Sequence, residues 1–200
     1  MPFALVVFDM DDVLCHYDVE RRLAELAAVT GRPVAAIRAA IWESDYFARA
    51  DAGEWDAQGC LDEFSRRIGA PLTRAQWVAT RKAAMTPFAD MLDLVRALKG
   101  RGTAVALLSN NDLLAKETLG EIFPGLPELF APHAYVSAEL GLAKPGPAIF
   151  REVCARLGVG PGRALFTDDL PENVEGARRA GLASHLFRGR AGLETALAAG

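Results

Sequence analysis

The alternation of apolar runs with amphipathic segments predicts a parallel sheet covered by helices. Residues 3–8 (FALVVF) form a continuous apolar run that includes β-branched side chains, as expected for a strand buried on both faces. After residue 87, apolar runs at 103–109, 134–137, 163–168 and 183–187 alternate with segments that have a helical period. Strands that alternate with helices are typical of crossover units on a parallel sheet. The predicted fold class is therefore α/β, with a Rossmann-like parallel sheet.

The segment between residues 18 and 85 has a helical pattern throughout. Asp18, Asp56 and Thr73 stand at N-cap positions of amphipathic segments, and Gly31 ends the first of them. Another helix is predicted over residues 32–47, with a proline in its first turn. We therefore predict a core made of residues 1–15 and 88–200, interrupted by a bundle of helices at residues 16–87.

Composition and charge exclude several classes of partner. The 200 residues include 22 Lys and Arg against 26 Asp and Glu, a net charge of −4, and no dense basic block occurs. This argues against binding of nucleic acid or of an anionic membrane surface. No stretch approaches the roughly 20 apolar residues of a membrane span, and no signal sequence precedes the first strand, so we expect a cytoplasmic protein. Three widely spaced cysteines indicate neither a disulfide framework nor a zinc site. The expected partner is a small molecule, and the expected state is a monomer or weak homodimer.

Polar side chains follow three of the predicted strands at the point where each strand ends. They are Asp9, Asp11 and Asp12 after the first strand, Ser109, Asn110 and Asn111 after the second, and Asp168 and Asp169 after the fourth, while Lys144 precedes a helix predicted from Pro145. Ligands of open α/β sheets bind outside the carboxyl ends of the strands. The sequence therefore predicts a polar site at one edge of an apolar sheet.

The carboxylates of this predicted site indicate phosphate chemistry. A group of carboxylates at a partly dry edge cannot all stay ionised and unpaired, so it needs a hard cation or a proton. Oxygen ligands without His or Cys favour Mg²⁺, which usually binds one or two carboxylates together with phosphate oxygens of the substrate. Lys144 and the Ser109 hydroxyl would supply further donors for a phosphoryl group.

Four segments in this order resemble the haloacid dehalogenase-like hydrolase superfamily over essentially the whole chain. They are VVFDMDDVL, ALLSNND, LGLAKPGPAIF and LFTDDLPENVEGA. Together with GEWD in the inserted segment, LSNND is similar to bacterial sugar-phosphate phosphatases typified by glucose-1-phosphate phosphatase. The resemblance implies a core sheet of strand order 3-2-1-4-5 and a helical cap of the superfamily's first cap class. One departure is Asp12, because many members carry Gly after the second Asp of the first motif.

The resemblance also implies a role for each motif residue. Asp9 would be the nucleophile, and Asp11 would protonate the leaving group and then activate water. The phosphoryl group would be held by Ser109, Asn110 and Lys144. Mg²⁺ would be held by Asp9, the backbone carbonyl of Asp11 and Asp169, with Asp168 as a further ligand or as a neighbour that orients one.

The function that we predict is Mg²⁺-dependent hydrolysis of a small phosphorylated metabolite, a sugar phosphate in the first place, through an aspartyl-phosphate. A phosphomutase would use the same residues together with a cap that holds a bisphosphate. A 2-haloacid dehalogenase would attack carbon without a metal and would not need Asp11 or the Asp168 and Asp169 pair. A non-catalytic binding protein on the same fold would be expected to have lost at least one charged motif residue, and none is missing.

Overall fold

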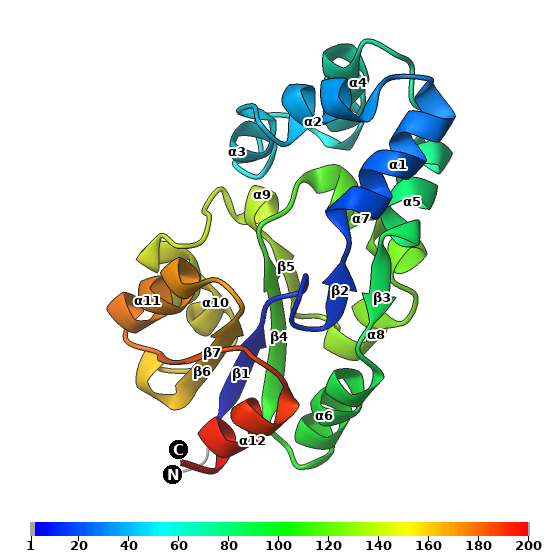
Figure 1. Ribbon diagram of the computed structural model, residues 1–200. Coiled ribbons are helices and arrows are strands. Elements are labelled where there is room, and N and C mark those ends of the chain that lie inside the picture. The colour runs from blue at the N-terminus through cyan, green and yellow to red at the C-terminus, as the bar shows by residue number, and fades with distance from the viewer. Residues whose placement is uncertain (1–2, 200) are drawn as a thin grey trace.

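Five parallel strands form the centre of the structure, a computed structural model that describes residues 3–199 (Figure 1). They are β1 (Leu5–Phe8), β4 (Ala104–Ser109), β5 (Ala134–Val136), β6 (Ala164–Asp168) and β7 (Ala183–Leu186). The strand order β5-β4-β1-β6-β7 confirms the predicted α/β class and the order 3-2-1-4-5. β1 therefore lies at the centre, between β4 and β6.

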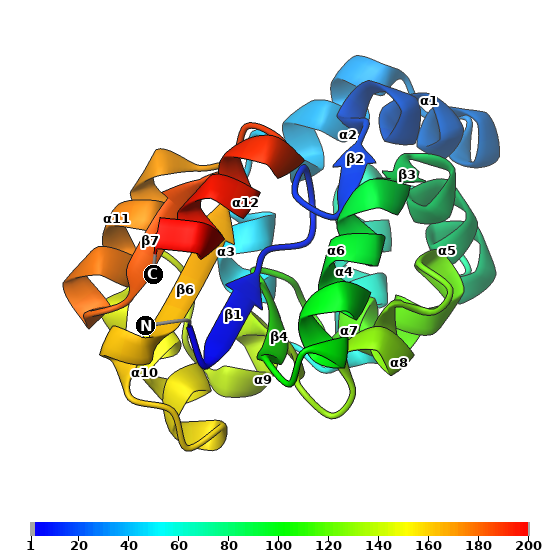
Figure 2. The same cartoon turned by 90° about the horizontal axis from the view of Figure 1, so that it is seen from below.

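Helices cover both faces of this sheet (Figure 2). The core helices are α6 (Ala89–Gly100), α7 (Leu113–Ile122), α8 (Leu126–Phe130), α9 (Ser137–Leu140), α10 (Pro147–Arg156), α11 (Pro171–Ala180) and α12 (Arg190–Ala199), with a short 3₁₀ helix at Pro161–Arg163. Side chains alternate along β1, so Leu5 and Val7 belong to an apolar cluster with α10 and α11. Val6 and Phe8 belong to a second cluster that includes α6 and α12. The continuous apolar run of β1 follows from this burial on both faces.

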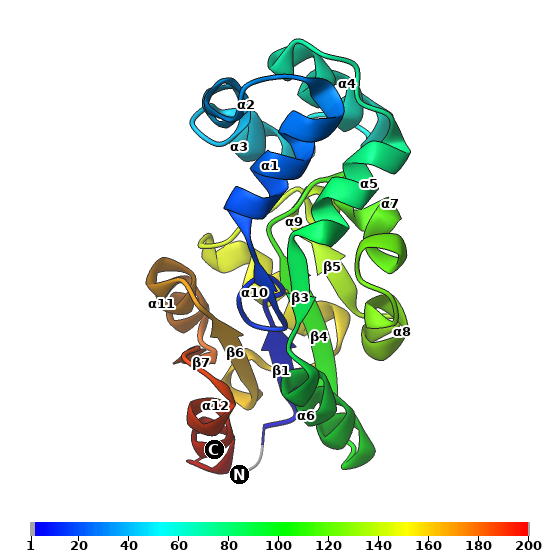
Figure 3. The same cartoon turned by 45° about the vertical axis from the view of Figure 1, so that its right-hand side comes forward.

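Between β1 and β4 the chain leaves the sheet and forms a helical cap, which Figure 1 shows above the sheet. Its elements are β2 (Cys15–Tyr17), α1 (Val19–Thr30), α2 (Val34–Ile41), α3 (Tyr46–Ala50), α4 (Ala57–Ile68), α5 (Arg74–Ala83) and β3 (Met85–Pro87). β2 and β3 pair in antiparallel fashion, so the chain enters and leaves the cap through one two-stranded ribbon (Figure 3). The domain boundaries predicted near residues 16 and 87 fall within this ribbon.

Side-chain caps begin three of the cap helices where the sequence predicts them. Asp18 accepts a hydrogen bond from the Arg21 backbone N–H at 2.9 Å and starts α1. Asp56 starts α4 in the same way. Thr73 and Gln76 form a capping box at α5. These local bonds satisfy backbone donors that a helix start leaves without partners.

The structure differs from the predicted elements at several places. The helix predicted over 32–47 is interrupted at residues 42–45, where Ser44 Oγ donates to the Ala40 carbonyl at 2.8 Å and accepts from the Tyr46 N–H at 3.1 Å. Such side-chain bonds compete with the helical ladder. α10 begins at Pro147 and not at Pro145, and the sequence did not predict β2 or β3, whose three residues each carry little periodicity. Within residues 3–199, no helix combines the length and apolar character needed to cross a bilayer.

Candidate active site

The carboxyl ends of β1, β4 and β6 meet at a cavity of about 280 Å³. The residues that line it include Asp9, Asp11, Asp12, Ser109, Asn110, Lys144, Asp169 and Asn173. Among the predicted site residues, Asp168 alone is absent from this lining, because its side chain is fully buried behind Lys144. The structure therefore brings the predicted site residues from four separate segments into one place.

A second cavity of about 450 Å³ lies next to the first and shares Asp12 and Asp169 with it. Apolar side chains such as Phe88, Met91 and Phe187 contribute to its lining, together with exposed charged residues. Although it is larger, it contains neither Asp9 nor Lys144. The smaller cavity is the one with groups capable of catalysis.

Asp9, Lys144 and Asp168 form a buried charged group at the base of the smaller cavity. Lys144 Nζ donates to Asp9 Oδ1 at 2.7 Å and to Asp168 Oδ2 at 2.6 Å. Burial raises the pKa of Asp9 to about 7, and the Asp168 charge acts in the same direction against the opposing charge of Lys144. Burial acts to lower the pKa of Lys144, but the two carboxylates raise it above its ordinary value. The Lys144 ammonium is therefore charged at neutral pH and neutralises one carboxylate of the pair.

Asp168 is held by hydrogen bonds to the segment that follows β6. Its Oδ1 accepts from the Leu170 backbone N–H at 2.9 Å, and Asn173 Nδ2 lies 3.1 Å from both carboxylate oxygens. Asn173 belongs to the first turn of α11, whose position thus depends on the same carboxylate. Asp168 is the group that fixes the direction of Lys144.

The end of β4 positions both Lys144 and a hydroxyl group. Asn110 donates from Nδ2 to the Lys144 carbonyl at 2.8 Å and accepts from the Lys144 N–H at 2.9 Å, so its side-chain amide holds that backbone in place and keeps a second N–H donor. Asn111 Nδ2 donates to Ser109 Oγ at 2.8 Å. Because Ser109 accepts this bond, its own hydroxyl hydrogen is free to point into the cavity.

Asp11 lies at the entrance of the cavity and contacts the cap. Its Oδ2 accepts from Arg81 Nη2 of α5 at 3.3 Å, and Cys15 Sγ lies 3.7 Å from Oδ1. Arg81 is buried, and its guanidinium lies over the rings of Tyr17 at 5.2 Å and Trp77 at 5.9 Å. The half-exposed carboxylate of Asp11 is thus the acid of this site that reaches both cavity and cap.

Three carboxylates form a group that suits a hard cation. Asp9, Asp168 and Asp169 each offer one oxygen, and these oxygens lie within 4.8 Å of one another. Asp169 is only partly buried, and an all-oxygen set without His or Cys matches the preference of Mg²⁺. The residues present therefore fit the ion that the sequence predicts.

The sequence did not identify Asn111, Asn173 and Arg81 as functional residues. Asn111 and Asn173 lie within the quoted motifs ALLSNND and LFTDDLPENVEGA, and Asn111 is among the polar residues expected at the end of its strand, but the sequence assigns neither of them a role. Arg81 is 70 residues from Asp11 in the chain and lies in a helix of ordinary amphipathic pattern. No local signal marks it.

Comparisons with known proteins agree with this geometry. A family model described as haloacid dehalogenase-like hydrolase matches residues 3–181. A phosphatase of Mycobacterium tuberculosis is 28% identical over 200 residues, an alignment that covers 93% of this chain and 88% of that protein. A glyceraldehyde 3-phosphate phosphatase of Methanopyrus kandleri is 32% identical over 136 residues, which cover 64% of this chain and 58% of that protein.

Solved structures share the whole architecture. A HAD-like family hydrolase of Porphyromonas gingivalis is 27% identical, has a TM-score of 0.77, and is matched over 92% of this chain and 91% of that one. A HAD family enzyme of Bacteroides thetaiotaomicron, solved in complex with magnesium and inorganic phosphate, has a TM-score of 0.75 at 24% identity, over 92% and 93% of the two chains. The match covers the cap as well as the core.

Proposed function

This chain belongs to the haloacid dehalogenase-like hydrolases, and from this premise we propose that it is a Mg²⁺-dependent phosphomonoesterase that acts on a small phosphorylated metabolite. The observation that carries the proposal is the environment of Asp9. Its Oδ1 accepts from Lys144, whereas Oδ2 has no hydrogen-bond partner within residues 3–199, and the residue lines the cavity together with Ser109 and Asp11. A buried carboxylate with one free oxygen beside a cation is suited to attack an anionic phosphate.

The proposed reaction has two displacements on phosphorus. Asp9 Oδ2 attacks the phosphorus, the bond to the leaving oxygen breaks, and Asp11 donates its proton to that oxygen. Asp11, now ionised, then removes a proton from water, which attacks the aspartyl-phosphate and releases inorganic phosphate. Lys144 and the Ser109 hydroxyl donate to phosphoryl oxygens in both steps, which places positive charge where negative charge develops.

The metal would be held by Asp9, Asp169 and the backbone carbonyl of Asp11, with an oxygen of Asp168 within reach. When bound, Mg²⁺ supplies positive charge that offsets the repulsion between Asp9 and the phosphate. In this proposal Asp168 acts chiefly on Lys144, because its oxygens already accept from Lys144, Leu170 and Asn173.

The proposal is tested by phosphate release from p-nitrophenyl phosphate and a panel of sugar phosphates, with Mg²⁺ and with EDTA. We expect activity that requires the metal and falls by about three orders of magnitude or more in Asp9→Asn. Asp93→Asn is a matched control, because this carboxylate is exposed on α6 and pairs with Arg96. Equal activity of Asp9→Asn and Asp93→Asn would overturn the proposal.

The covalent intermediate has a test of its own in Asp11→Asn. p-Nitrophenolate leaves without protonation, so the first displacement should survive, whereas water activation should be slower by about 10²–10⁴-fold. We expect a burst of about one equivalent of p-nitrophenolate per enzyme, followed by slow turnover. Slow release without a burst would exclude an accumulating aspartyl-phosphate.

A further inference from the structure

Helix α9 lies against the segment that follows β4 and carries Ser109. Ser109 ends β4 and is paired in the parallel sheet with Val136, which ends β5, so the two chains that leave these strands lie side by side. Asn111 belongs to the first of these chains, and Ser137, the first residue of α9, belongs to the second. Asn111 is 7% exposed and Ser137 is fully buried. Two buried polar residues therefore meet next to the candidate active site.

A single hydroxyl group, that of Ser137, bonds to both backbone groups of Asn111. Ser137 Oγ accepts from the Asn111 N–H at 3.1 Å and donates to the Asn111 carbonyl at 3.2 Å. The same carbonyl accepts from the Ala138 N–H at 3.3 Å. An ion pair of 2.9 Å between Lys116 of α7 and Glu139 of α9 joins the two segments a second time. The backbone at Asn111 is therefore fixed by its contacts with α9.

The Asn111 side chain uses this fixed backbone to contact the hydroxyl group of the site. Its Nδ2 donates to Ser109 Oγ at 2.8 Å, and no group within residues 3–199 accepts a hydrogen bond from Ser109 Oγ. A hydroxyl group that accepts from an amide keeps its own hydrogen for another acceptor. Because Ser109 is only 3% exposed and lines the catalytic cavity, that acceptor is a molecule bound in the cavity.

The cap contacts α9 at the residue next to Ser137. In the turn at residues 51–53, which follows α3, Gly53 has a φ of +79°, and a Cβ built there would lie 2.7 Å from the Ala138 carbonyl oxygen. A side chain would not fit in that space, so the backbone of the cap lies directly on α9. The helix that holds Asn111 is thus also the helix that the cap turn contacts.

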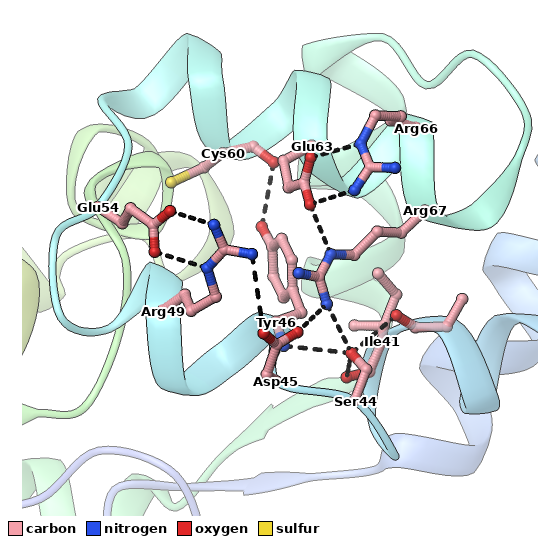
Figure 4. Close-up of polar contacts among 11 residues, drawn as sticks. Ile41, Ser44, Asp45, Tyr46, Arg49, Glu54, Cys60, Glu63, Arg66 and Arg67 are labelled. Atoms are coloured by element: carbon pink, nitrogen blue, oxygen red, sulfur yellow. Dashed lines mark hydrogen bonds and ion pairs between the residues drawn. The ribbon is translucent and has the colours of Figure 1, made fainter.

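Side chains of the cap hold this turn in one conformation (Figure 4). Arg49, which precedes the turn, makes a bidentate ion pair with Glu54, which follows it, with one bond from Nε at 2.6 Å. The Tyr46 hydroxyl donates to the Cys60 carbonyl at 3.1 Å and joins α3 to α4. Contacts that act together favour one geometry more strongly than a single exposed ion pair does. The position of Gly53 on α9 is therefore set by the packing of the cap.

We propose that Asn111 and Ser137 are positioning residues that direct the Ser109 hydroxyl to the phosphoryl group, and that the cap acts on the same hydrogen bonds through α9. Neither Asn111 nor Ser137 lines the catalytic cavity. Ser137 fixes the Asn111 backbone, Asn111 orients Ser109, and Ser109 donates to a phosphoryl oxygen. A donor oriented in advance is most effective where negative charge develops, so the arrangement acts on kcat more than on KM. This inference rests on the proposed phosphatase activity and concerns the assembly of the same site.

The test measures kcat and KM for p-nitrophenyl phosphate with Mg²⁺ in Ser109→Ala, Asn111→Ala and Ser137→Ala, and in the two double variants that include Ser109→Ala. We expect kcat to fall by about 10- to 100-fold in Ser109→Ala, which loses a donor to an anionic group, and by about 3- to 10-fold in the other two single variants. KM should change by less than about twofold. In the Ser109→Ala background, Asn111→Ala and Ser137→Ala should change kcat by less than about twofold, because the group on which they act is absent.

The matched control is Thr118→Val. Thr118 of α7 is also fully buried and its hydroxyl donates to the Leu114 carbonyl at 2.6 Å, but it does not line the catalytic cavity. This variant loses a buried hydrogen bond as Ser137→Ala does, and it should leave kcat unchanged. If Ser137→Ala and Asn111→Ala lower kcat by the same factor with and without the Ser109 hydroxyl, they only loosen the loop and the proposal is wrong. It is equally wrong if neither lowers kcat.

The part played by the cap is tested by combining Gly53→Ala with Ser137→Ala. Because both substitutions act on α9, the decrease in the double variant should differ from the product of the two single decreases by about threefold or more. Independent effects would exclude action of the cap through α9. If hydrolysis requires Asp9 but the effects do not depend on Ser109, this inference fails while the phosphatase stands; if no hydrolysis requires Asp9, the proposed function itself fails.

Discussion

Asp12 adopts a left-handed backbone conformation in the turn that follows Asp9, with a φ of +57°. The superfamily that this chain resembles often has Gly at this place, which is the residue that adopts positive φ without steric cost. Here contacts of the Asp12 side chain offset the cost of the positive φ. Its Oδ1 accepts from the Tyr17 N–H at 3.3 Å and contacts His16 Nδ1 at 2.9 Å. Aspartate and asparagine are among the few non-glycine residues that tolerate this region.

Replacement of Asp12 should therefore give a defined order of stability. Asp12→Ala loses both contacts and keeps the backbone cost, so we expect a loss of about 1–2 kcal/mol in the free energy of unfolding. Asp12→Gly loses the contacts but relieves the backbone, and Asp12→Asn keeps an acceptor, so both should lose less. Urea denaturation measures the order, and an alanine variant at least as stable as the glycine variant would contradict the explanation.

Asp51 should make the stability of the protein depend on pH. Its pKa in the folded state is about 7 and its ordinary value is 3.8, so between these values the folded state binds more protons than the unfolded state. Stability then falls as the pH rises from about 4 to 7, and the penalty is complete above pH 7. Asp51→Asn removes the ionisation, and we expect it to raise the free energy of unfolding at pH 8 by about 1–2 kcal/mol, after allowance for solvent screening.

Urea denaturation at pH 5 and pH 8 measures this effect. The gain from Asp51→Asn should be larger at pH 8, whereas Asp62→Asn, at an exposed carboxylate of α4, should show no such dependence. A gain that does not change with pH would show that the Asp51 carboxyl titrates normally.

At the residue scale, the sequence predicts which groups meet but not what each one contacts. Asp9 follows β1 directly, and Ser109 and Asp168 are the last residues of β4 and β6, so the parallel sheet brings them to one edge. The sequence predicts Asn110 as a phosphate ligand; in the structure Asn110 lines the cavity, and its amide also bonds to the Lys144 backbone, a contact that the sequence does not predict. This contact depends on the path of the loop that carries Lys144, which has no local sequence signal.

At the scale of elements, α11 packs unusually closely on the loop that carries Lys144. A Cβ at Gly176 would lie 2.2 Å from the Pro145 carbonyl oxygen, a contact that a backbone atom cannot relieve without movement of the helix or the loop. The same helix carries Asn173, which holds Asp168. Gly176 therefore allows helix α11 to lie directly against the loop that carries Lys144.

Gly176→Ala should consequently affect both stability and activity. We expect a loss of about 1–3 kcal/mol in the free energy of unfolding, with a decrease in kcat because Lys144 moves relative to Asp9. Gly120→Ala in α7 is the matched control, because a Cβ there makes an ordinary contact of 3.7 Å and alanine favours the helix by about 0.5–1 kcal/mol. Urea denaturation and steady-state kinetics on both variants decide the matter, and two variants of equal stability and activity would refute the close contact.

The helices and strands were predictable where burial gives the sequence a regular pattern of apolar residues and where a capping residue marks the start of a helix. The long apolar strands and the helices begun by Asp18, Asp56 and Thr73 appear as predicted. The break between α2 and α3 was not, because it depends on Ser44 bonding to nearby backbone groups in place of a continuing helix. β2 and β3 are too short for periodicity, and they are stabilised by their pairing with each other.

At the scale of the whole molecule, the cap packs on α7 through α4 and α5, and the contact between Gly53 and α9 holds it against the carboxyl end of the sheet. Gly53→Ala should disturb this contact, and we expect kcat/KM to fall about tenfold or more, equivalent to about 1.4 kcal/mol in the transition state. Gly31→Ala is the matched control, because Gly31 also has positive φ, at 69°, but a Cβ there meets nothing within 4 Å. Both variants carry a backbone cost, so similar kinetics would mean that the seating of the cap does not limit the reaction.

The relation of cap to core was the least predictable level of the structure. The resemblance of four motifs implied the sheet order and a helical cap, and the structure has both. The contacts of Arg81 with Asp11 and the position of Asp51 depend on how five cap helices pack on one another and on the core. The angles between packed helices depend on many small side-chain contacts, and these cannot be derived from the sequence alone.

The β2 and β3 ribbon gives the cap the topology of a loop whose ends are already tied together. The free-energy cost of joining the ends of a flexible loop rises only slowly with its length, by about 0.6 kcal/mol for each doubling. The sheet therefore tolerates large changes in the number of residues between Tyr17 and Met85, since its own strands and connections remain in place. We therefore expect that the cap can be exchanged as a unit while the carboxylates and Lys144 at the edge of the sheet stay in place.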